Sequence, residues 1–388
     1  MKKIVIAMDS FKGSVSGSEA ADAVARGVKT VLPDAEISAF SVSDGGEGLT
    51  SSLLSVLGGT TKTVRVHDAL GKSIDAEYGV IHDCAFVDGA DLAVIELASA
   101  SGLAGLKPEE RDPEKASSKG SGELILAAIK DGYRNFLIGL GGTATNDCGL
   151  GMLRALGFSF TDTDGKETCD GAAGLDGITD ISDVKVISEL NECKFFVSAD
   201  VNNPLYGKKG CTRVFSPQKG GTKETIEKEE RMITAFAATV KRYYPLADEN
   251  ESGAGAAGGF GYAFSTFLHA KILPGAKTFL EIIGFDEIVE NADLVITGEG
   301  RMDGQSTMGK IPVGVAAVAG KYSVPVVALV GCVGAGAGKC NDCGITAFFP
   351  VLGTPCTLEQ ALDVKTASDN IARTAEQLVR VIERFKAQ

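Results

Sequence analysis

Glycine is the residue that most constrains how this chain can fold. The sequence has 49 glycines in 388 residues, about one in eight against an average near 7%. They do not form a low-complexity tract but cluster in short loops between apolar runs. Glycine adopts backbone conformations closed to other residues and lets a ligand approach the main chain closely. The pattern is typical of an α/β protein that binds something with its backbone.

Short apolar runs alternate with helical segments at both ends of the chain. Residues 4–8 predict a strand, followed by a polar loop and a helix that ends at Pro33, and a second strand is expected at 37–42. Near the C-terminus we expect strands at 294–297, 326–330 and 345–351, a helix at 313–321 and a final helix opening at Thr357. This repetition predicts parallel strands with functional loops at their carboxyl ends.

The middle of the chain has a different pattern at first. Residues 61–100 contain short alternating runs that predict antiparallel or mixed strands. The strand–helix rhythm returns with helices expected at 123–130, 222–243 and 255–269 and strands at 136–140 and 195–197. The first 60 residues supply only two strands, too few for a closed parallel sheet. We therefore predict one doubly wound domain built from both chain ends, with the middle forming a second domain.

Composition excludes several classes of function. The formal charge of −13 argues against nucleic acid or an anionic membrane as the main partner, because phosphate contacts need clustered Lys and Arg. No apolar run is long enough to span a membrane. Nine cysteines, an odd number in a long chain, indicate reduced thiols and a cytoplasmic location rather than a disulfide framework.

Several familiar motifs occur but lack the context that gives them meaning. Residues 304–311 match a Walker A loop except that Ile311 stands where a Mg²⁺-binding hydroxyl is needed. The GAGAAG sequence at 253–258 follows polar residues rather than a strand, which weakens a dinucleotide-binding interpretation. Cys340 and Cys343 have metal-like spacing but no second pair nearby, so two unrelated thiols are favoured.

Five polar loops that follow apolar strands carry the candidate chemistry. They are Asp9-Ser10-Phe11-Lys12, the DGGEG sequence at 44–48, the GLGGTATND sequence at 139–147, Asp200 to Pro204 with residues 217–220, and residues 298–303 continuing to Lys310. Gly141, Gly142 and Thr143 offer backbone N–H groups that are expected to lead into a helix N-terminus, which suits phosphate.

The charged side chains of these loops complete the parts that phosphoryl transfer needs. Cations able to neutralise phosphate or carboxylate are Lys12, Lys219, Arg301 and Lys310. Carboxylates able to bind Mg²⁺ or act as a base are Asp9, Asp44, Glu47, Asp200, Glu299 and Asp303. An anion cradle, a metal, cations and a carboxylate that orients the hydroxyl are the parts of a phosphoryl-transfer site. Each loop alone is also compatible with a tight turn, and Asp44 or Asp147 with a helix cap.

The motifs, taken together and in order, resemble those of the bacterial glycerate kinase family, class I. The resemblance runs through the chain, from IVIAMDSFKGS at the start through SDGGEG at 43–48 and GLGGTATNDCGLGM at 139–152. It continues with ADVNNPLYGKKG at 199–210, FSPQKG at 215–220 and DLVITGEGRMDGQSTMGKIPVGVA at 293–316. It implies a Rossmann-like parallel-sheet domain formed by 1–60 and 286–388, a large inserted α/β domain formed by 61–285, and an active site in the cleft between them.

The resemblance also implies an activity. Members of this family phosphorylate D-glycerate with ATP and Mg²⁺, and this class usually gives 2-phosphoglycerate. We expect small-molecule substrates only, and a monomer or homodimer. Two alternatives stay open: a kinase of another small hydroxy acid or of the other glycerate hydroxyl, and a non-catalytic carboxylate- or nucleotide-binding sensor.

Within that frame each candidate residue receives a role. Gly141, Gly142 and Thr143 hold the ATP phosphates, and Asp44, Glu47 and Glu299 hold Mg²⁺ directly or through water. Lys12, Lys219 and Arg301 stabilise the transferring phosphoryl group or grip the glycerate carboxylate. Asp200 is the first choice for the group that orients or deprotonates the hydroxyl, and Asp303 the second. Further contacts to ATP or substrate are assigned to Asp9, Ser10, Asn146 and Lys310.

Overall fold

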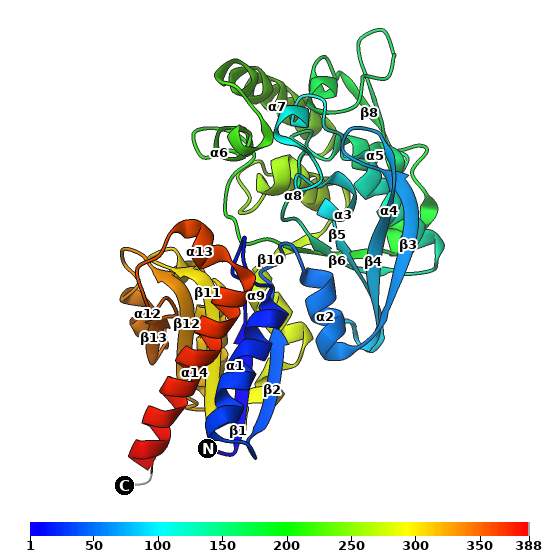
Figure 1. Cartoon of the computed structure of the whole chain (residues 1–388). Coiled ribbons are helices and arrows are strands. Elements are labelled where there is room, and N and C mark those ends of the chain that lie inside the picture. Colours follow the sequence, from blue (N-terminus) through cyan, green and yellow to red (C-terminus); the bar gives the residue numbers. More distant parts are fainter. Residues whose placement is uncertain (387–388) are drawn as a thin grey trace. The chain divides into compact units, whose positions relative to one another are not determined.

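The computed structural model describes residues 1–386 and divides the chain into two compact units (Figure 1). Unit 1 comprises residues 1–44, 51–58 and the chain from Pro274 onward. Unit 2 comprises residues 45–50 and 59–273. Unit 1 therefore contains both ends of the chain, and unit 2 is built from its middle.

Unit 1 is formed around a five-stranded sheet with the strand order β13-β12-β11-β1-β2, in which all neighbours are parallel. The strands are β1 (Lys3–Met8), β2 (Glu36–Ser41), β11 (Leu294–Met302), β12 (Val326–Val333) and β13 (Ala347–Pro350). Strand β1 is buried along its apolar run because it lies in the middle of the sheet. The predicted doubly wound, parallel α/β arrangement is confirmed.

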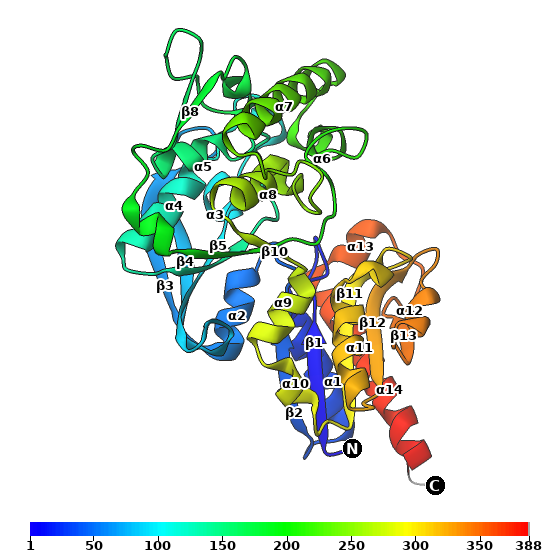
Figure 2. The same ribbon diagram turned by 180° about the vertical axis from the view of Figure 1, so that it is seen from behind.

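Helices cover both faces of this sheet. Helices α1 (Gly17–Val31) and α14 (Val364–Lys386) lie side by side on one face (Figure 1). On the other face lie α9 (Gly275–Ile282), α10 (Phe285–Val289) and α11 (Ile311–Lys321) (Figure 2). The short helices are α12 (Lys339–Asp342) and α13 (Leu358–Leu362), and α2 (Leu49–Leu57) begins in unit 2 and continues in unit 1.

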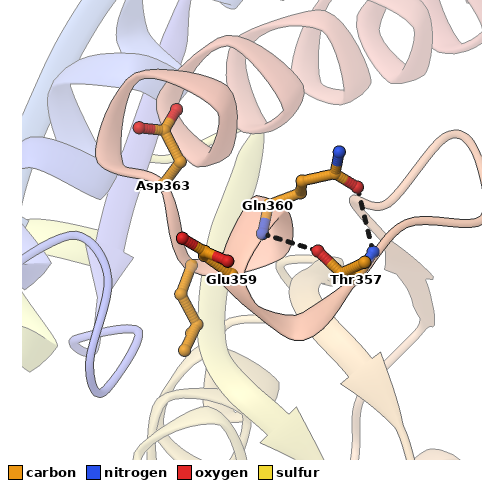
Figure 3. Close-up of a pocket in the computed structure, with 5 residues that line it drawn as sticks. Thr357, Glu359, Gln360 and Asp363 are labelled. Carbon is orange, nitrogen blue, oxygen red and sulfur yellow. Dashed lines mark hydrogen bonds between the residues drawn. The ribbon is translucent and has the colours of Figure 1, made fainter.

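The final helix differs from the prediction, because it is two helices. Thr357 caps α13 as expected: its Oγ1 accepts a hydrogen bond from Gln360 N, and the Gln360 side chain accepts one from Thr357 N (Figure 3). Asp363 then leaves the helical conformation with ψ 122°. Its Oδ1 accepts a 2.8 Å hydrogen bond from Thr366 N at the start of α14. Asp363 is therefore a second capping residue, and α14 begins directly after it.

Unit 2 is formed around a six-stranded sheet with the order β10-β9-β6-β5-β4-β3. Its strands are β3 (Thr60–His67), β4 (Ser73–Cys84), β5 (Ala90–Glu96), β6 (Asn135–Gly139), β9 (Lys194–Ser198) and β10 (Lys271–Leu273). Strands β3, β4 and β5 pair antiparallel, and β5, β6, β9 and β10 pair parallel. The mixed strands predicted between residues 61 and 100 are confirmed. Strands β7 (Ser159–Thr161) and β8 (Asp180–Ser182) form a separate pair.

The helices of unit 2 are α3 (Ala98–Ser101), α4 (Lys119–Lys130), α5 (Leu150–Ala155), α6 (Cys211–Phe215), α7 (Lys223–Tyr243) and α8 (Ala256–Phe267). Helices α3, α4 and α8 contact strands of this sheet, and the other helices of the unit pack on neighbouring elements. Short 3-10 helices lie at Ala85–Val87, Pro108–Glu110, Ala172–Leu175, Ser188–Glu192 and Pro217–Lys219, with one in unit 1 at Ser306–Met308. Phe136 and Phe195 stack on neighbouring strands with ring centroids 4.9 Å apart. Within residues 1–386, no helix is both long and apolar enough to cross a membrane.

Candidate active site

The carboxyl edge of the unit 1 sheet gathers several predicted residues. Asp9 directly follows β1, Asp44 lies three residues beyond β2, and Glu299 lies near the end of β11. These strands are adjacent, with β1 between the other two. Parallel strands end at the same edge of a sheet, and this edge is where open α/β sheets bind ligands. The loops of unit 1 that were predicted to act together therefore begin at the same edge of the sheet.

The pKa of Asp9 shows that the charged groups at this edge influence one another. The pKa of Asp9 is raised to about 7, mainly by burial and also by the carboxylates of Asp44 and Glu299, while the Ser10 N–H and Lys12 act in the opposite direction. Ser10 N donates a 2.6 Å hydrogen bond to Asp9 Oδ1. The three carboxylates and Lys12 thus interact electrostatically, as a shared binding site requires.

Glu299 is fixed by its neighbours in the loop that follows β11. Its side chain is 4% exposed, Ser306 Oγ donates a 2.6 Å hydrogen bond to Oε1, and Lys310 Nζ lies 3.5 Å from Oε2. Burial raises the pKa of Glu299. Nε of the exposed Arg301, next to the last residue of β11, lies 3.1 Å from Asp303 Oδ2. The last residues of β11 and the loop that follows it therefore present one buried carboxylate, Glu299, and two cations, Arg301 and Lys310.

The carboxyl edge of the unit 2 sheet brings two further motifs together. Glu96, Gly139 and Ser198 are register partners at the ends of β5, β6 and β9. A Cβ atom added to Gly141 would come within 2.6 Å of Gly46 Cα, so the two backbones touch. The DGGEG motif, with exposed Glu47, therefore lies against the first glycine of the predicted phosphate loop. Asp200 is exposed just beyond β9 on the same edge.

The predicted route from the glycine loop into a helix N-terminus is wrong. Helix α5 begins at Leu150, seven residues after Thr143, so Gly141 and Gly142 do not start it. The buried carboxylate of Asp147 occupies that helix start, accepting hydrogen bonds from Gly149 N at 3.2 Å and Gly151 N at 3.4 Å. Any phosphate contact of the loop therefore comes from its own turn, where Gly142 is exposed and has φ 76°.

Lys219 lies beneath this loop instead of pointing into solvent. It is 2% exposed, and Nζ donates hydrogen bonds to Thr145 O at 2.5 Å and to Thr143 Oγ1 at 3.5 Å. Burial lowers the pKa of Lys219 to about 8. The ammonium group thus supports the loop and supplies positive charge from below it.

A buried network continues from the loop to α7. Asn146 Nδ2 donates to Thr212 Oγ1 at 3.0 Å and to Glu229 Oε2 at 2.8 Å, and Ser216 Oγ donates to the same Glu229 oxygen at 2.9 Å. Glu229 is fully buried, and burial raises its pKa to about 7. Glu229 and Lys219 act on one another electrostatically across this network. A buried acid and a buried base therefore hold the loop from Thr143 to Asn146.

The raised pKa of Glu229 predicts how the stability of the fold depends on pH. From about 4.5 to 7 the unfolded chain has lost the Glu229 proton that the folded chain keeps, so the free energy of unfolding from this group falls as pH rises. The fall amounts to roughly 3 kcal/mol by the usual conversion from pKa. We expect E229Q to remove it, measured as the difference between urea denaturation curves of the variant and the wild type at pH 5 and pH 7. Equal pH dependence in the two proteins would contradict the buried acid.

The structure divides the predicted residues between the two units. Unit 1 carries Asp9, Ser10, Lys12, Asp44, Glu299, Arg301, Asp303 and Lys310, and unit 2 carries Glu47, Gly141, Gly142, Thr143, Asn146, Asp200 and Lys219. Within the described part of the chain, no three His, Cys, Asp or Glu side chains form a ready-made metal site. A surface depression at α13, lined by Thr357, Glu359, Gln360, Leu362 and Asp363, contains none of the predicted residues (Figure 3).

Comparison with known proteins decides the family. A family model described as the glycerate kinase family matches residues 4–383. The chain belongs to the glycerate kinase family. It is 38% identical to glycerate 2-kinase of Escherichia coli strain K12 over 98% of each chain. It is 39% identical to glycerate kinase of Bacillus subtilis strain 168, over 99% of this chain and 98% of that one.

A solved structure supports the same conclusion. The crystal structure of a protein described as glycerate kinase 2 from Salmonella typhimurium LT2 is 38% identical and has a TM-score of 0.85, with both chains covered completely. The family resemblance and the α/β fold class predicted from the motifs are confirmed.

Two glutamates of the candidate site, Glu229 and Glu96, were not identified from the sequence. Glu229 stands in the charged run EKEER, which looks like the solvated face of a helix. Glu96 follows an apolar run and carries no local motif. The position of Glu96 at the carboxyl end of a strand was the one usable signal, since such positions collect functional side chains.

Proposed function

We propose that this chain is a glycerate kinase that transfers the γ-phosphoryl group of ATP to D-glycerate and forms 2-phosphoglycerate. The observation that carries the proposal is the match to the glycerate kinase family over residues 4–383, with a relative named glycerate 2-kinase. D-Glycerate suits the residues of both edges, because it offers a hydroxyl nucleophile and a carboxylate that cations can hold. Turnover on this proposal requires residues of both units.

Unit 2 would bind the nucleotide phosphates and activate the acceptor. We assign the phosphate contacts to Gly141, Gly142 and Thr143, because the turn offers backbone N–H groups and Lys219 lies beneath it. Asn146 keeps the loop in place through Glu229. Asp200 would take the proton of the glycerate hydroxyl as the oxygen attacks phosphorus.

Unit 1 would supply charge to the same reaction. Lys12 and Arg301 would stabilise the transferring phosphoryl group or hold the glycerate carboxylate. Asp303, which pairs with Arg301, is the second choice for the base. Further substrate or nucleotide contacts are assigned to Asp9, Ser10 and Lys310.

The donor set fits Mg²⁺. This cation prefers oxygen ligands and is usually held by one or two carboxylates together with substrate phosphates and water. Asp44 and Glu299 raise the pKa of Asp9, a repulsion that a divalent cation would relieve. We assign Asp44 and Glu299 of unit 1 and Glu47 of unit 2 to hold the cation, directly or through water. When bound, Mg²⁺ neutralises negative charge on the ATP phosphates.

The choice of Asp200 as base gives a testable prediction. We expect D200N to lower kcat by roughly 10²- to 10³-fold with little change in thermal stability, because the side chain is exposed and general-base loss costs about this much. The matched control is D164N, an exposed aspartate in a turn of the same unit, which should keep wild-type kcat. Near-wild-type turnover by D200N would transfer the role to Asp303, which D303N then tests.

The direct test of the function is product formation by the full chain. Purified protein is given ATP, Mg²⁺ and D-glycerate, and the product is detected with enolase, which uses 2-phosphoglycerate directly. We expect signal without added phosphoglycerate mutase. Signal only with the mutase would keep the kinase but give 3-phosphoglycerate as product. Absence of ADP formation with D-glycerate and with other small hydroxy acids would favour a non-catalytic sensor.

The remaining expectations concern the location and partners of the protein. We propose a cytoplasmic enzyme that is a monomer or homodimer and has no nucleic-acid partner. The nine cysteines are unpaired in the described chain, which suits a reducing compartment, and the net charge of −13 disfavours phosphate polymers.

A further inference from the structure

Glu96 makes an unusual pair of contacts at the carboxyl edge of unit 2. It ends β5 opposite Gly139, which lies two positions before Gly141, the first glycine of the phosphate loop. Its Oε2 accepts a 2.9 Å hydrogen bond from Gly48 N, and its Oε1 accepts a 2.8 Å hydrogen bond from Thr50 N. One oxygen of the carboxylate therefore holds the last residue of the DGGEG segment, and the other holds Thr50, two residues beyond it.

These two N–H groups flank the first residue of α2, which is Leu49. The first N–H groups of a helix have no partner within the helix, and negative charge is favoured there. Residue 48 is a glycine and has no side-chain oxygen with which to cap the helix. A carboxylate 46 to 48 residues away in the sequence supplies the missing acceptor.

The backbone of residues 45–48 also packs closely against the ends of the neighbouring strands. A Cβ atom at Gly45 would come within 2.1 Å of Ser198 Oγ, and one at Gly141 within 2.6 Å of Gly46 Cα. Gly45 and Gly48 have φ values of 89° and 86°, which favour glycine. Glu47 lies between the residue that touches the phosphate loop and the residue that Glu96 holds. Its backbone is therefore fixed on both sides.

We propose that Glu96 is a positioning residue for the binding of Mg²⁺-ATP. It holds residues 45–50 so that the Glu47 carboxylate and the Gly141–Thr143 turn face the same triphosphate and its cation. Glu96 touches neither, and acts through the backbone of Gly48 and Thr50. This inference rests on the proposed kinase function for its ligand, but not on glycerate as the acceptor.

The substitution E96Q tests the carboxylate with the least change of shape. A glutamine has one acceptor oxygen and an NH₂ group, so it can accept from only one of the two N–H groups and opposes the other with a donor. We expect the KM for Mg²⁺-ATP to rise about tenfold, the change expected for loss of one charge-assisted hydrogen bond. The KM for D-glycerate should stay within about twofold. Hydrogen exchange of residues 45–50, followed by mass spectrometry, should become faster.

The matched control is E123Q in the same unit. Glu123 on α4 is also a half-buried glutamate that accepts a backbone hydrogen bond, but its donor is His67 N at the end of β3, 2.9 Å away and outside the candidate site. E123Q should leave both KM values unchanged. If E96Q does not fold, E96D takes its place, because it keeps the charge but withdraws the oxygens by one methylene group.

Calorimetric titration of each full-length variant with Mg²⁺-ATP separates this inference from the kinase proposal. Weaker binding by E96Q than by wild type supports the role of Glu96 even if D-glycerate is not phosphorylated. Equal affinity and equal KM for Mg²⁺-ATP in E96Q and wild type would overturn it, whatever the acceptor. A fall in melting temperature alone, without a change in these quantities, would show a merely structural role and also overturn it.

Discussion

Replacing Lys219 with methionine is expected to lower kcat by roughly 10²- to 10³-fold, the cost of removing one charge-stabilising group. Methionine keeps much of the volume of the buried side chain but removes the ammonium group beneath the phosphate loop. Thr145 O then loses the 2.5 Å hydrogen bond that ties the loop to residue 219. The loop therefore loses both its support and a positive charge that lies 3.5 Å from Thr143 Oγ1. A loop displaced by about 1 Å is by itself enough for a loss near 10²-fold.

The measurement is steady-state turnover with enolase coupling, together with a thermal melt of the same preparation. K208M is the matched control, because Lys208 is an exposed lysine of the same unit, 11 positions before Lys219. This variant should keep wild-type kcat. Wild-type kcat in a folded K219M protein would show that the buried ammonium group is not needed for turnover.

Replacing Gly258 with alanine is expected to destabilise unit 2 by about 3 kcal/mol or more, the sum of a left-handed alanine and an overpacked contact. Gly258 has φ 74°, and a Cβ atom there would lie 2.2 Å from Thr145 O and 2.8 Å from Asn146 Cα. The backbone of Gly258 cannot move away easily, because Cys148 N donates a 3.0 Å hydrogen bond to Gly258 O. Activity should fall with stability, because the displaced carbonyl is the one that Lys219 holds.

Urea denaturation at fixed pH measures this effect. The matched control is G320A in α11, where an added Cβ meets nothing within 4 Å and the residue is helical. That substitution should be neutral or stabilising by up to about 1 kcal/mol, because alanine is the better helix former. A G258A protein as stable as G320A would show that the contact between α8 and the phosphate loop can relax.

The strand–loop–helix order was predictable because it depends on local sequence. Buried parallel strands are continuous apolar runs, and the loops after them carry glycine and charge, so residues 4–8 and 294–297 could be recognised directly. The split of the last helix at Asp363 was not predictable in this way. Asp363 lies between two apolar helical patterns, where an aspartate is also compatible with the exposed face of one continuous helix.

The site was predictable in its loops but not in its supports. Asp9, Asp44 and Glu299 follow strands that the sheet order makes neighbours, so their common edge could be expected from chain order. Lys219 and Glu229 could not be assigned to the interior, because nothing local distinguishes a buried lysine from a solvated one. Their burial depends on tertiary contacts that join residues 143–146 to α7.

Two helix beginnings beside the phosphate loop are already neutralised by carboxylates of the chain itself. Asp147 occupies the start of α5, and Glu96 the start of α2. An ambient anion such as sulfate or inorganic phosphate would have to displace a tethered carboxylate, whose effective concentration is far above that of a free ion. The fold thereby discriminates against small competing anions, because these two helix starts are not available to bind them. The glycine turn is left for a polyphosphate, which several groups can bind at once.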